Sequence, residues 1–249
     1  MTIVQRLLLI LFLTFYASVM TFGQTSTNDI SDNDKQKLLY IAHKFVKRYQ
    51  QTRDIAPLLP EFFIGNFGEC LMEMRKFEEG KNELTKKDFI RGYVAEINSL
   101  YIVMVAGTYA SGAGNDAEGI TELFPTRIAK RFNQLAKGDG LLIDSDFSDR
   151  KQFLRKLKEH EAVIVEAQSY LRMKRIEQSA KYQKEFRKIE KDFSGYFIKA
   201  VPLPEDFHCK AISETAVKGY IALTPLGLQL IFAKIHNRFK LILAGPIDD

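Results

Sequence analysis

A long apolar helix predicted over residues 85–110 constrains the fold more than any other feature of this sequence. Its apolar side chains recur at three- and four-residue steps, which is the helical period, and they are Phe89, Tyr93, Ile97, Leu100 and Met104. Thr85 and Asp88 occupy the positions of an N-terminal cap and of an acidic residue in the first turn. The other face stays polar up to residue 99, with Arg91, Glu96 and Asn98. Every residue from 100 to 106 is apolar, so we expect these turns to be covered on all sides.

Shorter amphipathic patterns predict further helices on both sides of this one. Ser31, followed by acidic residues, predicts a capped helix over residues 31–53, and Pro57 fits the first turn of a short helix. Residues 149–192 form the longest helical pattern, and its phase slips between residues 173 and 180, where we expect a bend or break. The other predicted helices cover residues 70–80 and 125–137.

The character of the sequence changes after Gly195, where proline and glycine separate short runs that are typical of strands. Residues 228–235 and 239–243 flank the tripeptide His236-Asn237-Arg238, which predicts a hairpin turn. We expect two further strands, at residues 196–201 and 207–212. A small antiparallel sheet covered by helices is the simplest arrangement of these elements.

Together these patterns predict an α+β fold that is predominantly α-helical. A helical body surrounds a central buried helix at about residues 85–110, and a small antiparallel sheet or hairpin lies at the C-terminus. We expect four segments: a signal peptide (1–23), a flexible leader (24–34), the helical body (35–194), and a C-terminal α/β segment packed on the same core (195–249).

The N-terminal segment has the composition of a secretory signal peptide. Arg6 provides a short positive region, residues 7–19 are almost entirely apolar, and Thr21 and Gly23 are small residues at the positions that signal peptidase reads. We expect cleavage after Gly23 and an extracytoplasmic protein, either periplasmic or secreted. The alternative is an uncleaved membrane anchor, because the apolar run is close to the shortest length that spans a bilayer.

The charge balance excludes little, since the formal net charge of the whole chain is only +5. Nucleic-acid binding requires a recognisable module with a basic stripe, so we expect no nucleic-acid partner. The stretch from Arg172 to Lys191 is rich in lysine and arginine with glutamates interspersed. We interpret it as a solvated helix face in preference to a membrane-surface helix. The expected partner is an unknown protein or small molecule, with no stable membrane span after signal cleavage.

The sequence contains no recognisable catalytic, cofactor or metal motif, so catalytic residues are unknown and we expect no cofactor and no metal. The histidines (His43, His160, His208 and His236) stand at no metal-ligand spacing. Gly112-x-Gly114 resembles a dinucleotide fingerprint, but it follows a helix, so we interpret residues 107–119 as a loop. Acidic residues near 144–149 do not fit a calcium loop, and we expect Asp146 or Ser148 to cap the next helix. His208 and Cys209 are neighbours, but adjacent side chains on a strand point to opposite faces.

Cys70 and Cys209 are the only two cysteines of the chain. An even count in an exported protein suggests a single disulfide between them. The alternative is two buried thiols, because a chain of this length does not need a covalent cross-link for stability.

Two functional classes remain. The first is a non-catalytic binding or envelope-associated protein. The second is a small-molecule pocket protein or enzyme. For that class, the C-terminal hairpin and the stretch from Phe45-x-x-Arg48 to Arg53-Asp54 resemble the cone-shaped α+β barrels of the nuclear-transport-factor-2-like family. That resemblance covers about a quarter of the chain and implies a pocket inside the cone.

Overall fold

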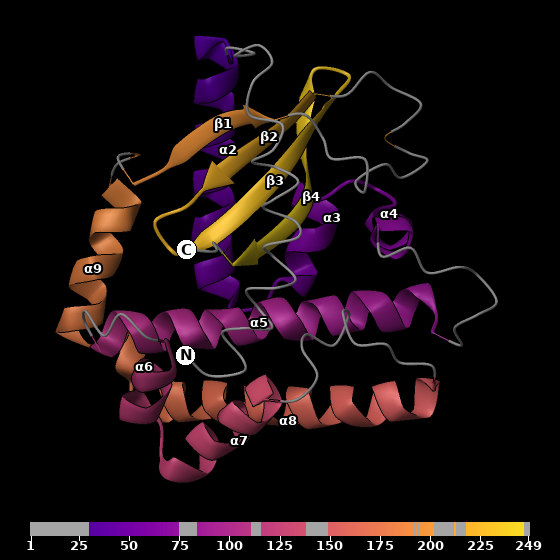
Figure 1. Ribbon diagram of the computed structural model, residues 1–249. Coiled ribbons are helices and arrows are strands. Elements are labelled where there is room, and N and C mark those ends of the chain that lie inside the picture. The colour runs from indigo at the N-terminus through magenta and orange to yellow at the C-terminus, as the bar shows by residue number, and fades with distance from the viewer. Residues whose placement is uncertain are drawn as a thin grey trace. The chain divides into compact units, whose positions relative to one another are not determined.

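The computed structural model describes residues 30–74, 84–110, 116–137, 149–191, 193, 195–201, 212 and 218–246. Its fold is α+β and predominantly helical, with a four-stranded antiparallel sheet at the C-terminus (Figure 1), which confirms the predicted fold class. The chain divides into two compact units. The first unit comprises Met1–Glu79 and Phe193–Asp249, and the second comprises Gly80–Asp192. The early helices therefore group with the C-terminal strands.

The first unit combines short helices with the sheet. Its helices are α2 (Asp32–Thr52), η1 (Ala56–Leu58), α3 (Leu59–Phe62) and α4 (Phe67–Met74). Its strands are β1 (Phe197–Val201), β2 (Lys218–Leu223), β3 (Leu228–Ile235) and β4 (Arg238–Pro246).

Helix α2 forms as its sequence predicts. The Ser31 hydroxyl accepts a hydrogen bond from the Asp34 backbone N–H at 3.2 Å, which satisfies one of the free donors at the helix start. The helix ends where Arg53 adopts a left-handed conformation and its N–H donates to the Tyr49 carbonyl. The apolar residues Leu38, Ala42, Phe45 and Tyr49 on one side of α2 are fully buried. The helix packs against β1 and β2.

The sheet has the order β1-β2-β3-β4, with every neighbouring pair antiparallel. The predicted β3–β4 hairpin is confirmed, because Ile235 pairs with Arg238 across a two-residue turn. His236 and Asn237 both have positive φ, 45° and 64°, as in the turns whose twist matches that of the flanking strands. Strand β2 was not predicted. Residues 207–211 of another expected strand lie outside the described residues.

The segment after α3 borders the sheet beside β4. Phe63 forms a parallel bridge with Leu241, and the Ile64 N–H donates to the Leu241 carbonyl at 3.0 Å. Phe63 also belongs to a cluster of aromatic rings. The centroid of its ring lies 4.7 Å from that of Phe67 and 6.2 Å from that of Phe45. This cluster ties α2, α3 and α4 to the sheet.

The second unit is entirely helical in its described residues. Its elements are α5 (Lys86–Ala110), α6 (Asp116–Leu123), α7 (Thr126–Lys137), α8 (Arg150–Met173), η2 (Ile176–Gln178) and α9 (Ala180–Lys191). Helix α5 is the centre of this unit, because α6, α8 and α9 all pack against it, while α7 packs against α6 and α8. The predicted break after Met173 is confirmed, since η2 separates α8 from α9.

The environment of α5 corrects two details of the prediction. No residue from 100 to 106 is exposed, yet Leu100, Val103 and Met104 are only half-buried, so coverage is incomplete. Glu96 and Asn98, assigned to the polar face, are in fact buried at 7% and 8% exposure. Both apolar and polar side chains of α5 are therefore buried.

The predicted loop at residues 107–119 is shorter than expected, because Gly107 is still in α5 and Gly119 is already in α6. A Cβ atom at Gly119 would lie 3.1 Å from the Ala106 carbonyl carbon. Glycine therefore permits the close approach of α6 to α5. Gly112 and Gly114 lie outside the described residues.

Among the described residues, one helix is long and apolar enough to cross a membrane by length and composition, the α5 segment Lys86–Tyr109. Of its most apolar window, 61% is buried inside the protein. The core helix of a folded domain satisfies the same two criteria.

Candidate functional site

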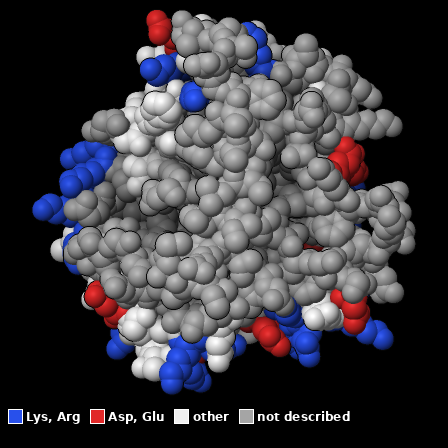
Figure 2. Space-filling model, in the orientation of Figure 1, with Lys and Arg blue, Asp and Glu red and all other residues white. Residues whose placement is uncertain are grey.

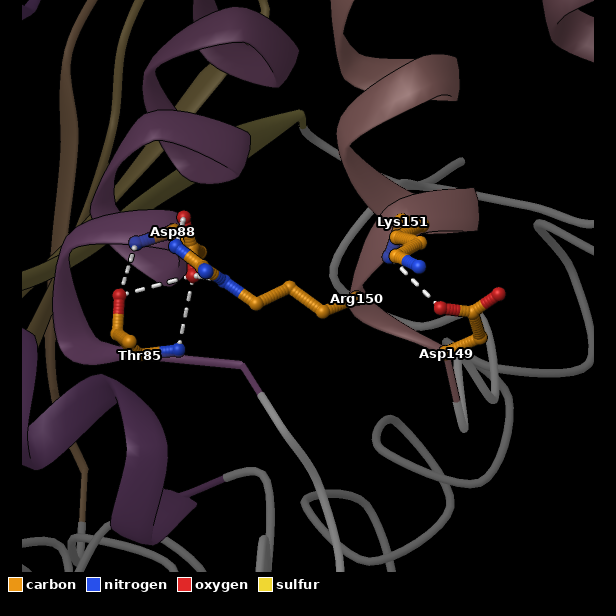
Figure 3. A network of polar contacts seen from close by, with 5 residues as sticks. All are labelled: Thr85, Asp88, Asp149, Arg150 and Lys151. Carbon is orange, nitrogen blue, oxygen red and sulfur yellow. Dashed lines mark hydrogen bonds and ion pairs between the residues drawn. The ribbon is translucent and has the colours of Figure 1, made fainter.

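The clearest polar cluster of the described residues lies at the start of α5 (Figure 3). The Thr85 backbone N–H and hydroxyl both donate to Asp88 Oδ2, at 3.0 and 2.8 Å. In return the Asp88 N–H donates to the Thr85 hydroxyl at 3.3 Å. This is a reciprocal capping box in which aspartate takes the place that glutamate usually has.

Helix α8 contributes an arginine to the same carboxylate. Arg150 extends from the first turn of α8 toward Asp88, and its Nε donates to Oδ2 at 2.7 Å (Figure 3). One residue earlier, Asp149 caps α8 by accepting from the Lys151 N–H at 2.8 Å. The expected cap was Asp146 or Ser148, and the structure corrects it to Asp149. We call Thr85, Asp88 and Arg150 the helix-start clasp.

The electrostatics of the clasp keep its carboxylate ionised. Burial opposes ionisation of Asp88, which is only 5% exposed, but hydrogen bonds from Arg150 and Thr85 outweigh it. The pKa of Asp88 therefore lies below its ordinary value. A buried carboxylate that is already charged and bound by several donors is a poor proton acceptor, so the clasp holds two helix starts together.

A second buried polar contact joins α5 to η2. The Tyr101 hydroxyl donates to Glu177 Oε1 at 3.1 Å, and both residues are buried. Glu177 is one of the glutamates interspersed in the basic stretch at residues 172–191, which was expected to be a solvated helix face. The structure instead places its carboxylate in the interior of the second unit.

Ion pairs attach α8 to its other neighbours. Arg91 of α5 binds Glu161 through two hydrogen bonds, one of them from Nε at 2.6 Å. Arg127 and Arg131 of α7 both bind Glu166. Three helices of the second unit are thus linked by arginine–carboxylate pairs as well as by apolar packing.

In the first unit the half-buried His43 of α2 lies among aromatic rings. Its ring lies 5.1 Å from the Phe193 ring and 5.9 Å from the Tyr196 ring, between centroids. The Tyr196 hydroxyl is 3.4 Å from His43 Nδ1, and burial raises the pKa of Tyr196. This aromatic contact fixes the start of β1 against α2.

The other histidines and the cysteines do not assemble a site among the described residues. His160 lies on α8, where burial lowers its pKa, and His236 occupies the β3–β4 turn. Cys70 is fully buried in α4. His208 and Cys209 lie outside the described residues, so the Cys70–Cys209 pairing stays a prediction. Within the described residues no cluster of three or more metal-binding side chains occurs.

The second unit carries a strongly basic helix face. Figure 2 shows lysine and arginine side chains along the left edge of the view, where Figure 1 places α9. We define the α9 basic face by its exposed residues Lys184, Arg187, Lys188 and Lys191. On the opposite side Tyr182 is buried, with its ring 5.4 Å from the Phe186 ring.

Comparison with known proteins identifies no relative. No protein-family model matches this sequence, and no curated protein or solved structure is significantly similar to it.

Sequence reasoning found one half of the helix-start clasp and missed the other. Thr85 and Asp88 were recognisable as a cap from their spacing. Arg150 gave no comparable signal, because its partner is 62 residues away in the sequence. The burial of Glu177 was equally invisible, since it depends on Tyr101 from another helix.

Proposed function

We propose that this protein is an exported, non-catalytic binding protein associated with the cell envelope. One observation carries the proposal: two buried carboxylates of the described residues are bound by structural partners. Asp88 is bound by Thr85 and Arg150, and Glu177 accepts from Tyr101. Such contacts stabilise helix packing, and a carboxylate that structural donors already bind is a poor catalytic base.

The proposed location rests on the sequence. Residues 1–23 have the n-region, apolar run and small-residue exit of a signal peptide, and they lie outside the described residues. Export and cleavage after Gly23 are therefore part of the proposal.

A second candidate, a small-molecule pocket protein, is favoured by Gln50. This residue of α2 is 7% exposed, and among the described residues neither its amide nitrogen nor its amide oxygen has a hydrogen-bond partner. A buried amide without partners is destabilising by about 1–3 kcal/mol. A bound polar ligand would remove that penalty, as would an internal water.

The experiment that separates the two candidates combines location with ligand response. We expect cell fractionation to recover the protein outside the cytoplasm, with an N-terminus at Gln24. An intact Met1 on cytoplasmic material would contradict the proposed location.

The same purified protein is then heated with a panel of small metabolites. A ligand that binds the native state at 100 times its Kd stabilises by about 2.7 kcal/mol. For a non-catalytic binding protein without a small-molecule pocket we expect no such shift. A saturable rise in melting temperature that is lost in Gln50→Leu would favour the pocket protein. The control Gln36→Leu, on the exposed side of the same helix, should keep that rise.

A further inference from the structure

The residues of the α9 basic face are spaced so that they lie on one side of the helix. They follow one another at steps of three, one and three, which places all four on one side of the helix. By the same spacing Tyr182 and Phe186 fall on the opposite side, where α9 packs against α5. The basic side chains therefore lie opposite the side of α9 where Tyr182 is buried.

The positive charge continues into the connection before α9. Arg172, Lys174 and Arg175 are exposed around the end of α8. Between them Met173 is 70% exposed, an unusual position for a large apolar side chain. This segment combines cations with one apolar side chain that the second unit does not cover.

The stretch from Arg172 to Lys191 is basic. Residues 172–191 contain eight basic side chains and three acidic ones, a net charge of +5, which equals the formal net charge of all 249 residues. One of the three acids, Glu177, is buried and bound to Tyr101. The exposed cations of this stretch form a basic surface.

We propose that the α9 basic face, together with Met173, docks the second unit onto a membrane surface rich in anionic phospholipid. The apolar side of α9 is used in the protein core, so the helix does not insert, and attraction between lysine or arginine and lipid phosphates drives the docking. Each such cation strengthens binding to an anionic membrane by about fivefold. Met173 enters the headgroup region, as exposed apolar residues among cations do at membrane interfaces. This inference rests on the proposed function, because an envelope protein works beside such a surface.

The test uses the exported protein and sedimentation with vesicles. We expect binding to vesicles of equal parts phosphatidylglycerol and phosphatidylcholine, little binding to pure phosphatidylcholine, and a steep decrease as salt is raised from 50 to 300 mM. Replacing Lys184, Arg187, Lys188 and Lys191 together by glutamine should weaken binding at least 50-fold. This is a lower bound, because four full contributions of about fivefold each would weaken binding further.

A matched control removes the same charge elsewhere. The quadruple variant Lys35→Gln, Lys37→Gln, Lys47→Gln and Lys158→Gln changes four other exposed lysines, and it should retain binding within about fivefold, the contribution of one cation. Met173→Gln should weaken binding severalfold without altering its salt dependence. All these positions are exposed, so circular dichroism should show unchanged folding.

Equal weakening in the two quadruple variants would overturn the proposal, because the effect would then follow net charge alone. Equal binding to both kinds of vesicle would also overturn it. If heparin binds through the α9 basic face while vesicles do not, the partner is a soluble polyanion and the lipid assignment is wrong. Recovery outside the cytoplasm without vesicle binding would refute this inference and leave the proposed function intact.

Discussion

Each unit of the chain contains both aromatic contacts and ion pairs, but in different arrangements. In the first unit, a cluster of aromatic rings around Phe45 and Phe63 packs α2, α3 and α4 beside the sheet. In the second unit, arginine–carboxylate pairs and the helix-start clasp join the helices in addition to their apolar contacts. Apolar packing is largely insensitive to pH and salt, whereas partly exposed ion pairs respond to both. The comparison teaches that apolar packing and ion pairs both stabilise this molecule, and the contribution of each can be tested separately.

The largest expected effect concerns the first unit and the predicted disulfide between Cys70 and Cys209. It would close a loop of about 140 residues and stabilise by about 5 kcal/mol in the chain-entropy estimate. Reduction should therefore lower the denaturant midpoint of the first unit and leave the second unchanged, as read by hydrogen exchange in α2 and α8. Two titratable thiols in unfolded, unreduced protein would end this prediction.

Truncation of the aromatic cluster is expected to come next. Phe45→Ala should destabilise the first unit by about 3–5 kcal/mol, because Phe45 is fully buried among aromatic neighbours. The matched change in the second unit, Ile102→Ala at an equally buried site of α5, should give about 2–5 kcal/mol. Urea unfolding monitored by circular dichroism measures both. A loss below about 0.5 kcal/mol, as at surface sites, would show that the residue is not in the core.

The helix-start clasp gives a smaller effect with a pH dependence. Arg150→Met should destabilise the second unit by about 1–3 kcal/mol, since a buried carboxylate loses its charged partner. The wild-type pKa of Asp88 is depressed below 3.8, so its stabilising contribution is complete above that pH and disappears as the pH falls through the native value.

In Arg150→Met, burial acts on Asp88 with less opposition, so its pKa rises and the acid-induced loss begins at a higher pH. Unfolding of the two proteins from pH 7 to pH 2 measures the shift. Parallel curves would mean that Arg150 does not determine the ionisation of Asp88.

The smallest effect is expected for Arg127→Met. The Arg127 side chain is 80% exposed, and Glu166 keeps Arg131 as a second partner. An exposed ion pair contributes below about 1 kcal/mol, and salt reduces it further. A loss as large as that of Arg150→Met would contradict the distinction between the buried clasp and the exposed pairs.

Local patterns in the sequence predicted most of the helices, although α6 was missed. Ser31, Pro57 and the slip after Met173 are signals carried by a few neighbouring residues, and each marks an element boundary that the structure contains. Strand β2 had no such signal. Lys218, Gly219 and Ala222 are poor strand formers, and β2 exists because β1 and β3 flank it.

Contacts between distant residues limited the prediction of the candidate site. Glu96 and Asn98 looked solvent-exposed, because periodicity reports which side of a helix is apolar but not how many neighbours surround it. The α9 basic face was visible as composition, but its significance depends on the burial of Glu177 beneath Tyr101. That contact joins residues 76 positions apart.

The first unit is interrupted in the sequence, and this determines the order in which the protein can fold during synthesis. Asp34 of α2 pairs with Lys234 of β3, 200 residues later. At about 5–20 residues per second, the ribosome needs about 10–40 s to supply that partner. The second unit is made in the interval and has its own helix contacts, so it can fold first. Helix α2 meanwhile lacks the strands that it packs against, so the nascent chain exposes Leu38, Ala42 and Phe45 until its last strands emerge.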